Sequence, residues 1–203
     1  LLGKTNTKRQ QIVEEVIAHA SDAAKQKKWK NIIILAHESY HEGVIGLAAS
    51  KLVEHYYLPA IVMSEKDGIY KASARSINGF NIIDAIRKLE TYLLSGGGHE
   101  MAAGFSIKKD DLGSFINEID KITASQLTED MRLRKLFIDL ELGFDLLSWD
   151  LAERLLTFEP CGVGNFTPVF QTRGVEIKSS KILGRDGKHL GLSLQANERE
   201  YPA

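Results

Sequence analysis

The sequence predicts an α/β domain followed by a mainly β domain, and three observations carry this prediction. Residues 31–36 and 59–63 are short, unbroken apolar runs of the kind found in strands buried on both faces. Residues 44–57 lie between them and repeat apolar side chains at helical spacing. From residue 135 onward, apolar and polar residues alternate, which indicates strands with one solvent-exposed face.

The strand, helix and strand within 31–63 are joined by short links, so they predict a βαβ unit with a right-handed crossover and a parallel strand pair. An amphipathic helix from Thr7 to Lys25 is expected to precede this unit. We therefore expect a mostly parallel sheet with flanking helices. The other elements expected here are a strand at 69–75, a helix at 81–94, a glycine-rich loop, a strand at 104–107 and a helix at 110–123.

The second domain is expected to open with a strand at 135–142. Ser148 is a suitable N-cap for the short helix that follows it. The further strands expected are at 169–170, 174–181 and 190–195, with a turn at 184–187. The change of pattern near Thr128 predicts three parts: a connecting helix at 1–28, the α/β domain at 29–127 and the β domain at 128–203.

Composition excludes several classes of protein. The net charge of the 203 residues is −1, so any nucleic-acid binding must come from a local patch rather than from the whole molecule. Cys161 is the only cysteine, which excludes an internal disulfide and a cysteine-based zinc site. No stretch approaches a membrane span and no basic-then-apolar leader occurs, so we expect a cytoplasmic protein without membrane contact.

A run of three glycines ends in a histidine at 96–99. Glycines let a backbone approach a ligand closely with its amides, and a histidine adds a donor or a positive charge. Gly97, Gly98 and His99 are therefore predicted to form a phosphate-binding loop. The alternative is a glycine cap on the preceding helix, which explains one or two glycines but not the histidine.

Residues 37–41, His-Glu-Ser-Tyr-His, match the H-E-x-x-H pattern of zinc proteases. The match directly follows a buried strand, so we expect it in a loop rather than within a helix, and we interpret it as coincidental. His41 instead lies just before Gly43 and Gly46, where the next helix begins and where anions are favoured. His41 is thus a candidate phosphate ligand; a loop histidine bonded only to backbone is the alternative.

Two hydroxyls flank an arginine at the end of the strand expected at 69–75. Arginine is shaped for bidentate phosphate contact, and serines add short donors, so Ser73, Arg75 and Ser76 are candidate phosphate ligands. A solvated surface arginine is the alternative. No Asp-x-Asp or Asp-His-His cluster, as metal-dependent phosphodiester cleavage would need, occurs in the sequence.

A basic ribbon is predicted in the β domain, where basic residues outnumber acidic ones between 173 and 188. Such a ribbon suits a groove that tracks a nucleic-acid backbone, although a solvated hairpin face is the alternative. Its basic residues are Arg173, Lys178, Lys181, Arg185 and Lys188.

Four segments together resemble the C-terminal part of RecJ-type single-strand-specific exonucleases, members of the DHH phosphoesterase superfamily. They are Tyr-His-Glu-Gly-Val-Ile-Gly at 40–46, Ser-Ala-Arg-Ser-Ile-Asn-Gly-Phe-Asn at 73–81, Gly-Gly-His through Ala-Ala-Gly at 97–104, and Pro-Cys-Gly-Val-Gly-Asn at 160–165 with Pro-Val-Phe at 168–170. The first three are similar to the DHH-associated domain. The last is similar to the nucleic-acid-binding OB-type domain that follows it, here an incomplete one.

The resemblance implies a parent enzyme that degrades single-stranded DNA 5′ to 3′ in DNA repair and recombination, with Mn²⁺ or Mg²⁺ held by a DHH domain missing from this sequence. It implies no catalytic and no metal-binding residue here, so the chain by itself is expected to be inactive. The expected partners are single-stranded DNA and a single-strand-binding protein or a helicase. The residues that it assigns to substrate phosphates are His41, Ser73, Arg75, Ser76, Gly97, Gly98 and His99.

The sequence departs from the RecJ pattern at three positions. RecJ usually has tryptophan and proline where this chain has Tyr40 and Glu42, and an aromatic residue in place of Cys161. Glu42 adds a negative charge beside His41. Two other functions stay open: a non-catalytic single-strand-binding or interaction module, and a phosphodiesterase for short oligonucleotides or cyclic dinucleotides. The latter enzymes typically lack the OB-like part, so residues 135–195 argue against them.

Overall fold

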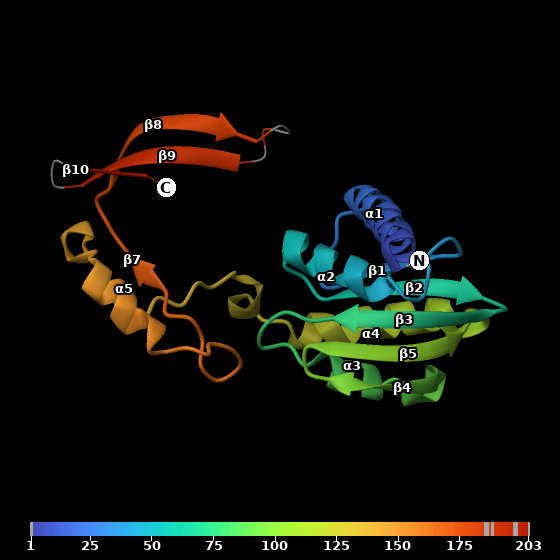
Figure 1. Ribbon diagram of the computed structural model, residues 1–203. Helices are drawn as coiled ribbons and strands as arrows, with labels where there is room; N and C mark the ends of the chain where they lie inside the picture. Colours follow the sequence, from blue (N-terminus) through green and yellow to red (C-terminus); the bar gives the residue numbers. More distant parts are fainter. Residues whose placement is uncertain (1, 185–186, 188, 197–198, 203) are drawn as a thin grey trace. The chain divides into compact units, whose positions relative to one another are not determined.

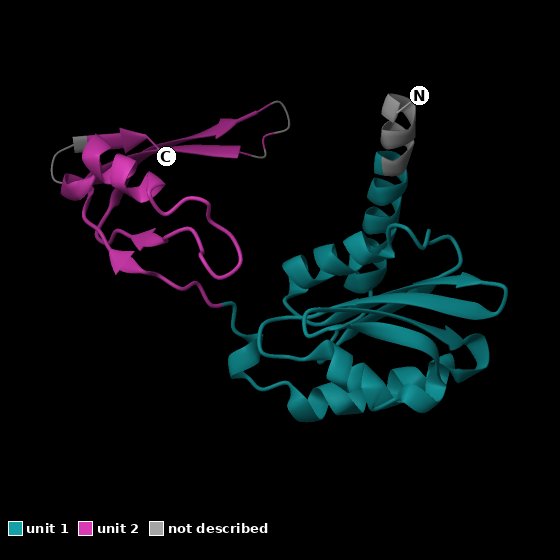
Figure 2. Cartoon of the chain, turned by 60° about the horizontal axis from the view of Figure 1, so that its bottom comes forward, with its two compact units in different colours: residues 1–134 teal, residues 135–203 magenta. Residues whose placement is uncertain are grey.

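The chain folds into two compact units, Leu1–Arg134 and Lys135–Ala203, which are coloured separately in Figure 2. The structure is a computed structural model and describes residues 2–184, 187, 189–196 and 199–202. None of the helices within these residues has the length and the apolar character needed to span a bilayer.

The first unit contains a five-stranded sheet (Figure 1). Its strands, in spatial order, are β1 (Ile33–His37), β2 (Ala60–Lys66), β3 (Ile69–Arg75), β5 (Ala102–Lys108) and β4 (Leu93–His99). β1 and β2 pair in parallel, as the βαβ pattern predicts. The α/β class and the helix between these strands are likewise confirmed.

The expectation of a mostly parallel sheet is wrong, because the other three strand pairs are antiparallel. The reason is local. Asp67 and Gly68 both have positive φ, 52° and 76°, and connect β2 to β3 as a two-residue hairpin. Asp-Gly is among the strongest hairpin signals in a sequence, and a hairpin can join only antiparallel strands.

Helices cover the two faces of the sheet unequally. α1 (Leu2–Lys25) and α2 (Ile45–Tyr56) pack over β1 and β2 on one face. α3 (Ile82–Arg87) and α4 (Leu112–Gln126) cover the other face, where Phe105 of β5 packs against Phe115 of α4 with ring centroids 5.1 Å apart. α1 and α2 leave β5 and β4 uncovered on their side (Figure 1), whereas α2 reaches β3, where Gly46 lies beside Ser73 and Arg75.

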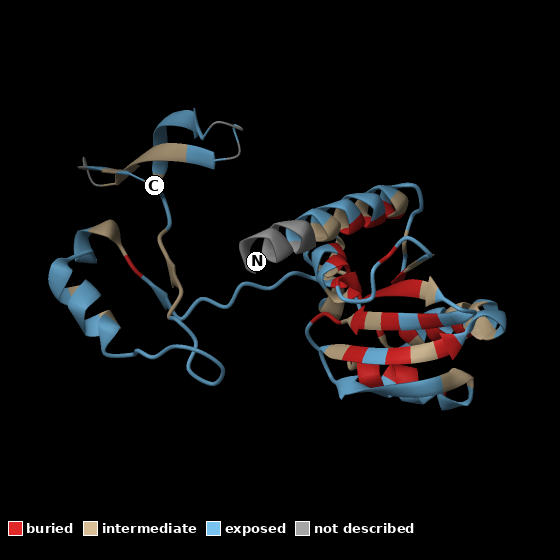
Figure 3. Cartoon of the chain, turned by 45° about the vertical axis from the view of Figure 1, so that its right-hand side comes forward, coloured by how far each residue is buried: buried red, intermediate tan, exposed pale blue. Residues whose placement is uncertain are grey.

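The exposure of the residues along β3 and β5 reflects which face of the sheet each residue points to. Along both strands, buried residues alternate with exposed or half-buried ones, as Figure 3 shows. Tyr70, Ala72 and Ala74 of β3 are buried on the α4 side. The side chains between them therefore lie on the opposite, uncovered face, because successive residues of a strand point to opposite faces.

The glycine run does not form the expected loop. Residues 93–99 are the edge strand β4, and β4 is joined to β5 by a turn at Glu100 and Met101. The expected helix at 81–94 is correspondingly shorter: α3 ends at Arg87, and a 3₁₀ turn follows at Glu90–Tyr92. Neither the loop nor the helix-cap interpretation is correct, because the glycines take part in a β-ladder.

The second unit is mainly β, as expected. β8 (Glu176–Leu183), β9 (His189–Ala196) and β10 (Arg199–Pro202) form an antiparallel sheet, and α5 is Trp149–Leu156. Ser148 caps α5 as predicted, since the amide of Leu151 donates to its Oγ at 3.1 Å. The strand expected at 135–142 is reduced to β6 (Leu140–Glu141), which pairs in parallel with β7 (Phe170–Gln171).

Candidate nucleic-acid interface

The uncovered face of β3, β5 and β4 forms a platform of polar and very small residues. Directly paired residues of neighbouring antiparallel strands point to the same face, so the ladder arranges the platform in rows. The rows across β3, β5 and β4 are Arg75–Ala102–His99, Ser73–Gly104–Gly97 and Lys71–Ser106–Ser95. This platform brings four predicted residues together: Ser73, Arg75, Gly97 and His99. Gly98 pairs with Ala103 in the row of the buried Ala74, so it faces the other side of the sheet.

Arg75 is held in place by its own strand. Its Nη1 donates to Ser73 Oγ at 3.0 Å and to the Ala74 carbonyl at 2.9 Å. Its guanidinium lies over the first turn of α2, where a Cβ added to Gly46 would be 2.9 Å from Arg75 Nη2. Gly46 is therefore needed for this close approach, and the half-buried guanidinium is preorganised at the edge of the platform.

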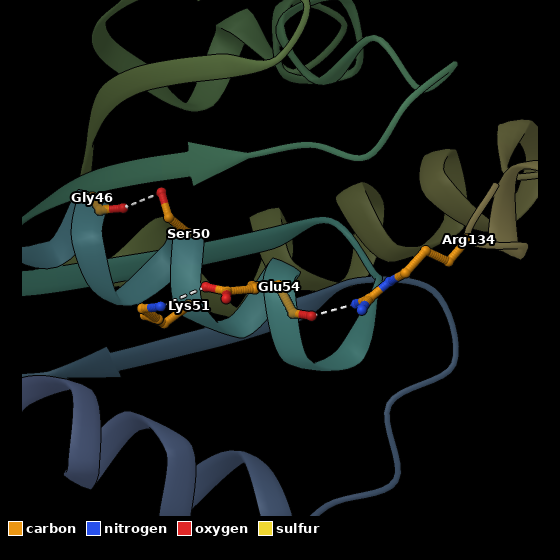
Figure 4. Close-up of polar contacts among 5 residues, drawn as sticks. All are labelled: Gly46, Ser50, Lys51, Glu54 and Arg134. Atoms are coloured by element: carbon orange, nitrogen blue, oxygen red, sulfur yellow. Dashed lines mark hydrogen bonds and ion pairs between the residues drawn. The ribbon is translucent and has the colours of Figure 1, made fainter. Parts of the chain in front are cut away.

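α2, which borders the platform, is fixed along its length (Figure 4). Ser50 Oγ donates to the Gly46 carbonyl at 3.0 Å, and Lys51 pairs with Glu54 at 2.6 Å. At the C-terminal end of the helix, Arg134 donates to the Glu54 carbonyl. A cation at this end satisfies a free carbonyl and complements the helix dipole. These contacts tie the C-terminal end of α2 to Arg134, while Gly46 at its other end borders the platform.

The glycines of β4 have two different roles. Gly98 has φ 152°, and a Cβ there would come within 2.3 Å of the Ala102 carbonyl oxygen, so the hairpin itself requires glycine. Gly97 lies on the platform, and a Cβ there would meet no atom within 4 Å. At Gly104, opposite Gly97, the nearest atom to an added Cβ would be 3.8 Å away. Neither the backbone conformation nor the packing requires glycine at positions 97 and 104. A ligand that lies close to the platform would require it.

The different surroundings of Gly98 and Gly97 predict different effects of an alanine substitution on the free energy of unfolding. Gly98→Ala is expected to lower the free energy of unfolding by more than about 2 kcal/mol, because its methyl group collides with the β5 backbone. Gly97→Ala is the matched control and is expected to leave stability unchanged or slightly higher. Denaturant unfolding measures both. Equal losses for the two variants would show that β4 does not pair with β5 as described.

His99 is exposed at the end of β4, in the row of Arg75. Its position is set by the turn that follows it: the amides of Ser76 and Ile82 donate to the carbonyls of Met101 and Glu100 at 3.0 and 3.1 Å. This anchoring places an imidazole beside the platform without using its ring nitrogens in a hydrogen bond within the described residues.

Ser76 lies below the platform rather than on it. It is 4% exposed, and its hydroxyl donates to the Phe80 carbonyl, closing the turn at 77–80. The hydroxyl donor is thus committed within the protein, while Ser73 keeps its own hydroxyl hydrogen available. Ser76 supports the segment that follows Arg75.

His41 is in the loop between β1 and α2, and its Nδ1 accepts from the Gly43 amide at 3.1 Å. A neutral imidazole in this state carries its proton on Nε2, which leaves one donor for a ligand. Its neighbour Glu42 pairs with Lys71 Nζ at 2.5 Å. His41 therefore lies toward the Lys71 row, four residues of β3 away from Arg75, so the predicted ligands form an elongated site rather than a single point.

This loop is anchored by Tyr40, which is 3% exposed. Its hydroxyl bonds His19 Nδ1 of α1 at 3.0 Å, and Ser64 of β2 donates to its carbonyl. Burial raises the pKa of Tyr40 above its usual value.

The pKa of Glu42 is lowered, first because Lys71 donates a hydrogen bond to it and then through the positive charge of Lys71. Glu42 is thus ionised at neutral pH.

A groove of about 730 Å³ lies beside the start of α2, over the Ser73 and Lys71 rows of the platform. Several of its lining residues are not among the phosphate ligands predicted from the sequence: Glu42, Lys71, Ser95, Gly104 and Ser106. The period of two in Lys-x-Ser-x-Arg at 71–75 was a usable signal for Lys71. Ser95 and Ser106 become visible only once β4 is known to be a strand.

The basic ribbon of the second unit is only partly described. Arg173 pairs with Glu141 at 3.0 Å, and Lys178 pairs with Glu176 at 3.5 Å. Lys181 is exposed on β8 opposite Gly191, with no ion pair among the described residues. Two further predicted members, Arg185 and Lys188, lie outside the described residues.

Metal ligands do not gather in the part of the chain that the structure describes: no group of three or more His, Cys, Asp or Glu side chains is placed to hold an ion there. His37 ends β1, and residues 38–39 form a turn, which confirms that the H-E-x-x-H match lies outside a helix. The chemistry that the platform offers is therefore anion binding by a guanidinium, imidazoles, hydroxyls and open backbone.

Comparison with known proteins identifies the families of the two units. The model of the DHHA1 domain family matches residues 10–125, and that of the RecJ OB domain matches residues 138–203. The single-stranded-DNA-specific exonuclease RecJ of Bacillus subtilis is 28% identical over 197 residues, 96% of this chain and 25% of the relative. RecJ of Dickeya dadantii is 32% identical over 168 residues, 80% of this chain and 29% of the relative.

The chain thus spans less than a third of the length of these relatives. The crystal structure of Thermus thermophilus RecJ in complex with Mn²⁺ has the same fold, with a TM-score of 0.80 and 24% identity over 100% of this chain and 29% of that chain. The chain belongs to the DHHA1 domain family and, with the RecJ OB domain that follows, corresponds to the C-terminal region of the RecJ exonucleases.

Proposed function

We propose that the chain is the substrate-binding part of an exonuclease that degrades single-stranded DNA 5′ to 3′ in DNA repair and recombination. The platform of β3, β5 and β4 holds consecutive phosphates of the strand, and the OB domain provides further contacts. The observation that carries this proposal is the pair Gly97 and Gly104, which leave the platform open although neither backbone nor packing requires glycine there.

The dimensions of the platform favour one strand over a duplex. Three adjacent strands span only about 10 Å, because neighbouring strands are about 4.8 Å apart. α2 borders the groove on one side. A DNA strand that runs from row to row along the platform meets Arg75 and His99 at one end. Its backbone can approach Gly97 closely. These groups neutralise and position phosphates.

Hydrolysis belongs, in this proposal, to divalent ions held by another part of the enzyme. Solved RecJ structures contain Mn²⁺ or Mg²⁺, whereas the described residues of this chain offer no ligand cluster that fits an ion. The chain would therefore place the substrate at the metal centre. Single-strand-binding protein or a helicase would act with the enzyme to supply the strand.

The 203-residue chain is expected to bind 5′-labelled single-stranded DNA more tightly than a duplex of the same length, and to leave it uncut when Mn²⁺ is added. Fluorescence anisotropy measures the affinities, and a denaturing gel detects cleavage. Affinity should fall steeply with salt, because bound phosphates release counterions. Equal affinity for duplex, or processive degradation by this chain, would contradict the proposal.

A further inference from the structure

The groove lies beside Arg75 and His99 rather than around them, and Ser73 is the predicted phosphate ligand that lines it. Its lining includes Glu42, Lys71, Ser95 and Ser106, which all lie toward the row at the far end from Arg75. Within the described residues, the hydroxyls of Ser95 and Ser106 have no hydrogen-bond partner in the protein. This end of the groove therefore offers one cation and two free hydroxyls on a solvent-exposed face.

The spacing of the rows suits the backbone of a stretched single strand. Successive rows are two residues apart along β3, which is about 6.8 Å for an antiparallel strand. This is about twice the axial rise of 3.4 Å per phosphate in one strand of a duplex. A single DNA strand stretched to about twice its length in a duplex would thus present one phosphate to each row. The row of Lys71 would meet the third phosphate when the row of Arg75 meets the first.

Lys71 is not freely available, because its Nζ lies 2.5 Å from Glu42 Oε2. Both side chains are more than half exposed, 60% for Lys71 and 55% for Glu42. An exposed ion pair of this kind adds little net stability, since water solvates both charges well. A phosphate that enters the groove can therefore replace the carboxylate as the partner of Lys71, although Glu42 opposes its entry.

We propose that Lys71, Ser95 and Ser106 bind a further phosphate of the strand, and that Glu42 competes with this phosphate for Lys71. The inference rests on the proposed function, because it extends the same bound strand along the same platform. It makes Glu42 a determinant of selectivity. A ligand with one or two phosphates that starts at the Arg75 row ends before the Lys71 row and is unaffected by the competition. In a longer DNA strand, the third phosphate gains its contact with Lys71 by displacing Glu42.

Glu42→Gln in the 203-residue chain tests the competition. The affinity for a 5′-phosphorylated thymidine octamer is expected to rise about threefold or more, and the slope of log K against log salt to steepen by up to about 0.7, as for one more phosphate contact. Lys71→Gln is expected to lower the octamer affinity about threefold or more. The control is Glu118→Gln, which frees Lys121 on α4 from a similar pair at 2.7 Å.

The 5′-phosphorylated thymidine dinucleotide is used as a competitor and carries only two phosphates. Its affinity should be the same for the unaltered chain and for both variants. The inference is overturned if Glu42→Gln acts no more strongly than Glu118→Gln, or if Lys71→Gln leaves the octamer affinity unchanged. Such a result leaves the proposed function standing as long as Arg75→Gln still weakens the octamer. If the unaltered chain binds no octamer, the proposed function and this inference both fail.

Discussion

Replacing Arg75 with glutamine is expected to lower the affinity for single-stranded DNA about 10- to 100-fold. Hydrogen bonds to charged groups contribute about 1.5–3 kcal/mol each, and the guanidinium is already oriented by Ser73 and the Ala74 carbonyl. The free energy of unfolding should change by less than about 1 kcal/mol, because Arg75 is half-buried and forms no ion pair among the described residues. Anisotropy titration and denaturant unfolding measure the two quantities.

Arg87→Gln is the matched control for Arg75→Gln. Arg87 is an exposed arginine on α3, on the covered side of the sheet, and its partner Asp84 is 3.5 Å away. The control removes the same charge from the same unit, so it should change DNA affinity less than twofold. If both variants weaken binding equally, the effect comes from net charge and not from the platform.

Gly97→Val is expected to weaken DNA binding at least about tenfold, a loss of about 1.4 kcal/mol, and at the same time to stabilise the fold. The valine side chain fills the space above the platform in which the phosphate backbone must lie. Space exists for it, because an added Cβ meets no atom within 4 Å. Glycine is unfavourable within a strand, so valine should add about 0.5–1 kcal/mol to the free energy of unfolding.

The opposite signs of these two effects make the test specific. Gly113→Ala, in the first turn of α4, is the control for a glycine whose replacement also has open space. It should stabilise the helix without changing DNA affinity. A Gly97→Val variant that binds DNA as well as the unaltered chain would show that the bound DNA does not pass over Gly97 of β4.

The fold could be predicted as far as local patterns determine it. The buried runs of β1 and β2 and the helical repeat of α2 gave the βαβ unit, and Ser148 gave the start of α5. The antiparallel half of the sheet differs from the predicted parallel order because Asp67 and Gly68 close a hairpin between β2 and β3. The strand β4 was missed because glycines carry no hydrophobic pattern, so only pairing with β5 reveals it.

The candidate site was predictable residue by residue but not in its shape. Arg75 and His99 do share one row of the sheet, which the sequence alone could not show. Gly98 belongs to the hairpin rather than to the open surface. The Glu42–Lys71 pair joins a loop to a strand 29 residues away and depends on tertiary structure. Long-range contacts of this kind have no signal in a single sequence.

Mapping of backbone amide shifts by NMR tests the central claim most directly. A single-stranded thymidine octamer is titrated into the ¹⁵N-labelled chain, and the shifts of its amides are followed. The account predicts large, saturable shifts on the platform, at Gly97, Gly104, Ser106 and the first turn of α2. Shifts confined to α3 and α4, or to residues 135–203, would contradict it.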